Sequence, residues 1–146
     1  MKTTRTESIF GSDRAIIGMV HLRALPGTPA GQDPLQRITQ EAVREARMLA
    51  DAGFDAIMLE NMHDVPYLKR EVGPEIISSM TAIAGEVRRA VDVPMGIQVL
   101  AGANMASLAI AHATGCQFIR AEGFVFASVA DEGAMLDGSA TGNRAN

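Results

Sequence analysis

Gly53-Phe54-Asp55-Ala56-Ile57-Met58-Leu59-Glu60 is the segment that decides the fold, because residues 115–122, Gly115-Cys116-Gln117-Phe118-Ile119-Arg120-Ala121-Glu122, repeat its layout. Both copies place a glycine, an isoleucine and a glutamate at the same spacing around an apolar run. The glycine predicts the end of a helix, and the unbroken apolar run is typical of a strand buried on both faces of a parallel sheet. The repeat therefore predicts two βα units built on one template.

Two further apolar runs, at residues 15–20 and 96–99, give four predicted strands together with residues 56–59 and 118–121. Helices are predicted between the strands from apolar residues spaced three and four apart. The first helix begins after Asp33-Pro34, with Asp33 as the N-cap acceptor, and ends at Gly53. The apolar stripes of the first two helices are Leu35, Ile38, Ala42, Ala46 and Leu49, then Ile76, Met80, Ile83, Val87 and Val91, and the third helix covers residues 104–114.

Strands that alternate with helices predict an α/β fold with a parallel sheet. Repeated units favour a (β/α)8 TIM barrel over a doubly wound sheet, and the sequence has neither a glycine-rich dinucleotide loop nor a Walker phosphate loop. Four strands do not close a barrel. We therefore predict a half barrel, in which residues 1–14 form an N-terminal tail and residues 15–146 form the N-terminal part of one truncated barrel domain.

The composition limits which partners the protein can bind and in which cell compartment we expect it. A net charge of −4 and thirteen scattered basic residues argue against nucleic-acid binding, and a hydrophobic content of 47% is typical of a globular domain. No apolar run is long enough for a signal peptide or a bilayer span, which leaves only peripheral membrane association. Cys116 is the single cysteine, so no internal disulfide forms and we predict a cytoplasmic protein.

Polar residues stand at the carboxyl ends of the predicted strands. Because parallel strands end at one edge of the sheet, and alternate residues share a face, these side chains are expected to meet in one site. The predicted catalytic residues are His21, Glu60 and Glu122, and the predicted substrate-binding residues are Asn61, Gln98 and Arg120. We predict no metal site, and the sequence identifies no cofactor.

Each of these residues also has a purely structural interpretation. His21 could cap a loop or pack in the core, and Arg120 must pair with Glu60 or Glu122 if it points into a barrel. The same arginine could instead clamp a phosphate or carboxylate with its planar fork. A metal bound by His21, Glu60, Glu122 and the His63-Asp64 pair is the weaker alternative, since no tight ligand spacing supports it.

Several blocks of the sequence together resemble one family. They begin with Ile16-Ile17-Gly18-Met19-Val20-His21-Leu22 and Leu25-Pro26-Gly27-Thr28-Pro29, and continue with residues 53–61, 94–100 and 113–120. In order and spacing, from about Ala15 to Gly138, they are similar to the BtpA/SgcQ family. That resemblance implies a TIM barrel similar to phosphosugar-binding barrels, with family members linked to photosystem I biogenesis and to a sugar-utilisation gene cluster.

The sequence departs from the family at two positions of the predicted site and in its length. The family usually has asparagine where this chain has Gln98 and Glu122, which implies a more acidic pocket. Family members are longer, and residues 138–146 stand where the fourth helix should begin, so we expect an N-terminal fragment. Barrels commonly bind phosphate with the loops after strands 7 and 8, so this part would supply reacting groups without that anchor.

Three functions follow as alternatives. The first is an enzyme that binds a small metabolite, with or without a phosphate group, with Glu60 or Glu122 as base, His21 as acid or base and Arg120 as anion clamp. The second is a non-catalytic assembly factor for a membrane complex such as photosystem I. The third is an inactive truncated fragment. Because a half barrel exposes two edge strands and an apolar face, we also expect a homo-oligomer.

Overall fold

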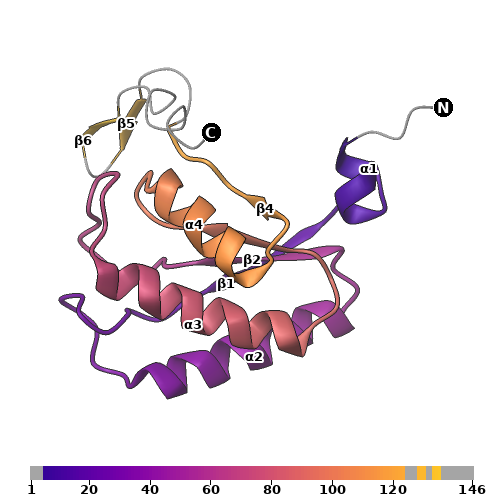
Figure 1. Cartoon of the computed structure of the whole chain (residues 1–146), viewed down its shortest axis with the longest axis horizontal. Helices are drawn as coiled ribbons and strands as arrows, with labels where there is room; N and C mark the ends of the chain where they lie inside the picture. The colour runs from indigo at the N-terminus through magenta and orange to yellow at the C-terminus, as the bar shows by residue number, and fades with distance from the viewer. Residues whose placement is uncertain (1–4, 124–127, 131–132, 136–146) are drawn as a thin grey trace.

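The computed structural model describes residues 5–123, 128–130 and 133–135. Its elements, in chain order, are α1 (Arg5–Phe10), β1 (Ile17–His21), α2 (Leu35–Asp51), β2 (Ala56–Glu60), α3 (Pro74–Ala90), β3 (Met95–Gln98), α4 (Asn104–Thr114), β4 (Phe118–Ile119), β5 (Ser128–Ala130) and β6 (Gly133–Met135) (Figure 1). The order from β1 to β4 confirms the predicted alternation of strands and helices. Residues 138–146, where the fourth barrel helix is expected to begin, lie outside the described residues.

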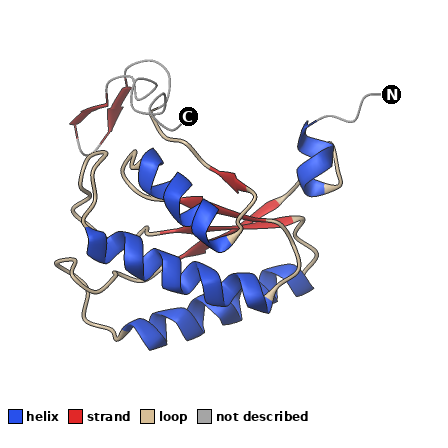
Figure 2. Ribbon diagram, in the orientation of Figure 1, coloured by secondary structure: helices blue, strands red, loops and turns tan. Residues whose placement is uncertain are grey.

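Strands β1 to β4 form one parallel sheet in the order β1-β2-β3-β4, and β5 pairs with β6 in a separate antiparallel hairpin. Helices α2, α3 and α4 lie side by side against one face of the parallel sheet (Figure 2). Sequential parallel strands joined through helices on one face are repeated βα units. The α/β class and the parallel sheet are therefore confirmed.

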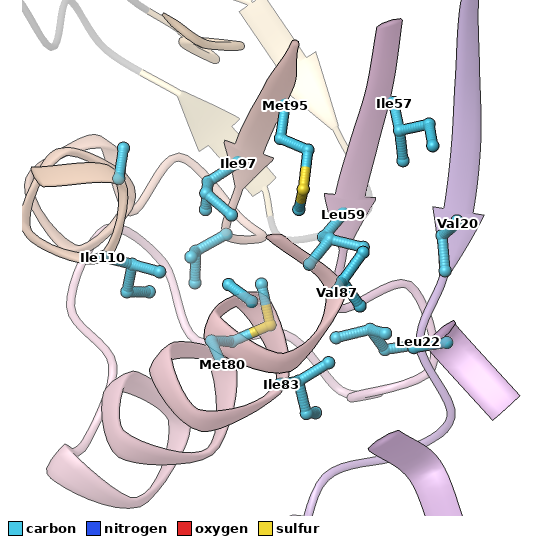
Figure 3. Packing of buried hydrophobic residues seen from close by; sticks show 14 of the residues in the cluster. Val20, Leu22, Ile57, Leu59, Met80, Ile83, Val87, Met95, Ile97 and Ile110 are labelled. Carbon is cyan, nitrogen blue, oxygen red and sulfur yellow. The ribbon is translucent and has the colours of Figure 1, made fainter. Parts of the chain in front are cut away.

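The strand side chains alternate between the two faces of the sheet. Leu59 and Ile97 point into the core with Met80 of α3 (Figure 3). Their chain neighbours Glu60 and Gln98 consequently point to the opposite face, which we call the second face. This division agrees with the prediction from period-2 alternation, and it separates the apolar core from the polar residues at the strand ends.

The helices bury the predicted apolar stripes, but the predicted N-cap is wrong. In α2 the buried members are Ile38, Ala42 and Ala46, and in and just after α3 they are Ile76, Met80, Ile83, Val87 and Val91. No side chain caps α2, which follows Pro34. The Asp33 carboxylate instead lies 3.0 Å from Nη1 of Arg37 and 3.3 Å from Nη1 of Arg23. Two guanidinium groups attract a carboxylate more strongly than one neutral backbone N–H does.

The repeated glycines end helices as predicted, whereas β4 is shorter than predicted. Gly53 and Gly115 have φ values of +88° and +71°, in the left-handed region that glycine adopts without a steric cost, and they follow α2 and α4. Strand β4 contains only residues 118–119 instead of the predicted 118–121. Arg120 therefore stands one residue beyond the strand, and Glu122 stands in the loop that follows.

Helix α1 lies within the segment predicted as an N-terminal tail, and the sequence patterns did not predict it. Its last residue, Phe10, contacts Phe118 edge to face, with ring centroids 5.0 Å apart and an interplanar angle of 74°. Alternation from Ile119, which packs against the core, places Phe118 on the second face. This contact places the end of α1 on the second face, near the start of the strands (Figure 1).

Candidate functional site

The ends of β1, β2 and β3 place three predicted site residues side by side. His21 is the register partner of Glu60, and Glu60 is the register partner of Gln98. The N–H of Arg120 donates to the carbonyl of Ile97 at 3.2 Å, which continues the pairing of β4 with β3 by one residue. His21, Glu60, Gln98 and Arg120 therefore form one row across the sheet, which we call the polar row.

Glu60 is the centre of the polar row. Its Oε2 lies 3.1 Å from Nε2 of His21, and its Oε1 lies 3.4 Å from Nη2 of Arg120. The Glu60 side chain is 4% exposed, whereas the side chains of His21 and Arg120 are 44% and 56% exposed. A carboxylate removed from water needs such partners, since an unpaired buried charge is strongly unfavourable. Of the two partners predicted for Arg120, Glu60 and Glu122, the structure shows Glu60.

Gln98 lies between the two ends of the Arg120–Glu60 pair. Arg120 follows β4 and Glu60 ends β2, so the arginine side chain has to cross β3, whose last residue is Gln98. Gln98 is only 2% exposed. Within the described part of the chain, its Oε1 is buried and has no hydrogen-bond partner. The polar row therefore contains one buried acceptor that the described residues leave without a donor.

Asn61 is next to Glu60 in sequence but belongs to a different set of contacts. Its Oδ1 accepts the N–H of Leu100 at 2.7 Å, and its Nδ2 donates to Oδ2 of Asp64 at 2.9 Å. The residue is almost completely buried. Asn61 thus joins the loop after β2 to the loop after β3, and its predicted role in substrate binding stays a prediction.

Asp64 lies in the loop after β2, and the sequence patterns did not predict that it connects two loops. Its Oδ1 accepts the N–H of Leu25 at 2.7 Å, so it connects the loop after β2 to the loop after β1. Burial raises the pKa of the Asp64 carboxyl, and the hydrogen bonds from Leu25 and Asn61 oppose that shift. The local signal in the sequence is the pair of turn-forming residues Asn61 and Asp64. In the structure a 3.3 Å hydrogen bond from the N–H of Asp64 to the carbonyl of Asn61 closes this turn.

Glu122 lies apart from the polar row. Its Oε2 accepts the N–H of Gly102 at 2.9 Å. Its backbone N–H donates to Oδ1 of Asn104, and its carbonyl accepts from Nδ2 of Asn104, at 3.0 and 2.9 Å. Glu122 therefore ties the loop after β4 to the start of α4. Its carboxylate is used there, and a catalytic role for it stays a prediction.

A groove lies at one end of the polar row, and the described residues form no metal centre. The groove has a volume of about 470 Å³ and is lined by His21, His63 and Glu41 of α2, but not by the other members of the polar row. Among the described residues, no three His, Cys, Asp or Glu side chains are grouped in a way that could hold a metal ion. None of the described helices has both the length and the apolar character required to cross a membrane.

Comparisons with known proteins identify relatives of the chain. The family model described as "BtpA family" matches residues 12–143. An uncharacterized mitochondrial protein of Caenorhabditis elegans is 44% identical over 140 residues, which cover 92% of this chain and 50% of the relative. An uncharacterized protein of Archaeoglobus fulgidus is 44% identical over 128 residues, with coverages of 88% and 51%.

A third relative has a name that states a role. The photosystem I biogenesis protein BtpA of Synechocystis is 35% identical over 131 residues, which cover 90% of this chain and 45% of that protein. No solved structure matches the chain. The chain spans about half the length of the curated relatives it matches.

Proposed function

This chain belongs to the BtpA family, and on that premise we propose that it is half of a (β/α)8 barrel whose polar row binds a small anionic molecule. The barrel is supported by four sequential parallel strands with helices on one face, in a chain half as long as its relatives. Barrel enzymes carry their sites at the carboxyl ends of the strands, which is where the polar row lies.

The half barrel predicts that the 146-residue chain associates with itself. In the described part of the chain, β1 and β4 each pair on one side only, which leaves backbone N–H and C=O groups on their free edges. We expect light scattering after size exclusion to give a dimer or larger species, and a monomer for the full-length Archaeoglobus fulgidus relative as the comparison. A monodisperse monomer of this chain with cooperative unfolding would contradict the half barrel.

The observation that carries anion binding is the buried Glu60 carboxylate between two exposed donors. Glu60 occupies one edge of His21 and one of Arg120 and so fixes the orientation of both side chains. Arginine presents five N–H donors in a planar fork, so one contact to Glu60 leaves donors for a phosphate or carboxylate. The buried anion thus positions two groups that suit a second, bound anion.

The same arrangement supports acid–base chemistry at His21. Its Nε2 contacts the Glu60 carboxylate, which accepts hydrogen bonds, so the proton is assigned to Nε2. The other ring nitrogen, Nδ1, then accepts a proton in neutral imidazole or donates one in imidazolium. We propose His21 as the acid or base, Glu60 as the group that orients it, and Arg120 as the anion clamp.

Replacing Arg120 with glutamine is expected to weaken the binding of inorganic phosphate by about ten- to a hundredfold, because a hydrogen bond to a charged group contributes about 1.5–3 kcal/mol. Isothermal titration calorimetry on the purified chain measures the change. Arg47→Gln is the matched control, since Arg47 is exposed on α2, away from the polar row. If circular dichroism shows that both proteins are folded, equal phosphate affinity of the wild type and Arg120→Gln would contradict the proposed anion site.

The assembly-factor function is the second candidate, and the name of the Synechocystis relative is what favours it. A scaffold needs an outer surface for a partner and makes no demand on the polar row. If inorganic phosphate and small carboxylates fail to bind, this candidate replaces the first.

A further inference from the structure

The unpartnered Oε1 of Gln98 is the observation that extends the proposed function. Gln98 is 2% exposed, and its Oε1 has no hydrogen-bond partner in the described part of the chain. Nearly all buried amide oxygens in proteins are hydrogen-bonded, because an unmet acceptor loses its water without a replacement. A ligand that brings a hydrogen-bond donor to this oxygen would supply the missing partner.

The position of Gln98 places this acceptor inside the proposed anion site. Gln98 pairs in register with Glu60 on one side, and Arg120 follows the strand on its other side. The guanidinium of Arg120 reaches Glu60 without bonding to the Gln98 oxygen. A ligand whose anionic group is bound by Arg120 and His21 therefore brings its remaining atoms next to Gln98.

The charges of the polar row select the kind of donor. An ammonium group next to Gln98 would lie near the Arg120 guanidinium, whose like charge repels it, while both oxygens of the neighbouring Glu60 carboxylate are already paired with His21 and Arg120. A hydroxyl group supplies the same hydrogen bond without a charge, and its own oxygen can accept from the arginine. The row therefore favours a ligand with a hydroxyl close to its anionic group.

We propose that Gln98 Oε1 accepts a hydrogen bond from a ligand hydroxyl, so that the site selects small hydroxylated anions, such as short polyol phosphates or hydroxycarboxylates. This inference rests on the proposed function of the polar row. It assigns Gln98 as the specificity-determining residue, and Arg120 as the residue that supplies anion affinity. A site built around a buried acceptor rejects analogues that lack the hydroxyl, since the acceptor then stays unpaired.

The test compares ligand pairs that differ only in hydroxyl groups, measured by calorimetry on the purified chain. The phosphate pair is glycerol 3-phosphate and n-propyl phosphate, and the carboxylate pair is glycerate and propionate. In the wild type the hydroxylated member of at least one pair is expected to bind about tenfold more tightly. In Gln98→Met, which keeps the length of the side chain but removes the acceptor, that ratio is expected to fall to about one, while Arg47→Gln keeps it.

A second readout does not depend on binding. Because no described residue bonds to Oε1, Gln98→Met is expected to unfold at an equal or higher urea concentration than the wild type. A marked loss of stability would mean that the oxygen is already satisfied, for instance by a trapped water, and would overturn the inference.

The binding outcomes separate the inference from the function on which it rests. Equal affinities within both pairs, together with weaker phosphate binding by Arg120→Gln, would overturn the hydroxyl selection and leave the anion site standing. No binding of any anion, or no effect of Arg120→Gln, would overturn the anion site and the inference with it.

Discussion

Replacing Leu59 with alanine is expected to lower the free energy of unfolding by about 2–5 kcal/mol. Leu59 is fully buried in β2 and lies in the core that the sheet forms with the helices (Figure 3). Alanine removes the buried methyl groups and leaves a cavity, because the surrounding strands and helices relax only in part. Since domains are stable by only about 5–15 kcal/mol, urea denaturation followed by circular dichroism should show a large shift of the midpoint.

Two further variants keep this prediction decisive if Leu59→Ala does not fold. Ile97→Val removes one methyl group from the same core and is expected to lower stability by about 0.5–1.5 kcal/mol. Met48→Ala is the surface control, because Met48 is 64% exposed on α2 and its loss is expected to change stability by less than about 0.5 kcal/mol. Similar midpoints for all three variants would contradict the assigned core.

The regular elements could be predicted because hydrophobic periodicity and glycine positions are local signals. Residues 104–114 were predicted as a helix and form α4, which ends at the left-handed Gly115. The strand positions followed from apolar runs, although β4 proved two residues shorter than predicted. Its length depends on hydrogen bonds to a neighbouring strand, and these are not encoded in the four residues themselves.

Much of the polar row could also be predicted, because one rule decides it. Parallel strands end at a common edge, so His21, Glu60 and Gln98 are brought into register once the strands are correct. The rule does not decide which side chains of the row contact each other. Arg120 was expected to pair with Glu60 or Glu122, and only the structure shows that its side chain crosses β3 to reach Glu60.

The contacts that the sequence could not predict are long-range contacts between loops. Asp64 binds the backbone of Leu25, 39 residues away, and Asn61 binds that of Leu100, also 39 residues away. Such bonds depend on where each loop runs after its strand, and hydrophobic periodicity carries no information about loops. Asp33 illustrates the same limit, since its cap position was plausible locally and two arginines offered stronger partners.

Replacing Asn61 with alanine is expected to lower the free energy of unfolding at pH 7 by about 2–4 kcal/mol, because a buried unsatisfied group costs about 1–3 kcal/mol and a bond to a charged group contributes a similar amount. The substitution leaves the N–H of Leu100 without its acceptor and Asp64 without one donor. The loops after β2 and β3 would lose the hydrogen bond that joins them, while Asp64 keeps its bond to Leu25. Urea denaturation of both proteins at several pH values measures the loss.

The pH dependence of that loss tests the role of Asp64. Burial raises the pKa of Asp64 and the Asn61 hydrogen bond opposes the shift, so Asn61→Ala raises that pKa further. A carboxyl whose pKa is raised by folding costs the folded state least in acid, where it is protonated. The folded state is destabilised increasingly as the pH rises from the pKa of the unfolded chain, about 4, through the higher pKa of the folded protein. The loss of stability in Asn61→Ala should therefore be smaller at pH 3.5 than at pH 7.

The control is Gln40→Ala, on the exposed face of α2, which should show neither this loss of stability nor its pH dependence. A deficit that is equal at both pH values would mean that Asn61 stabilises the loops only through the Leu100 N–H.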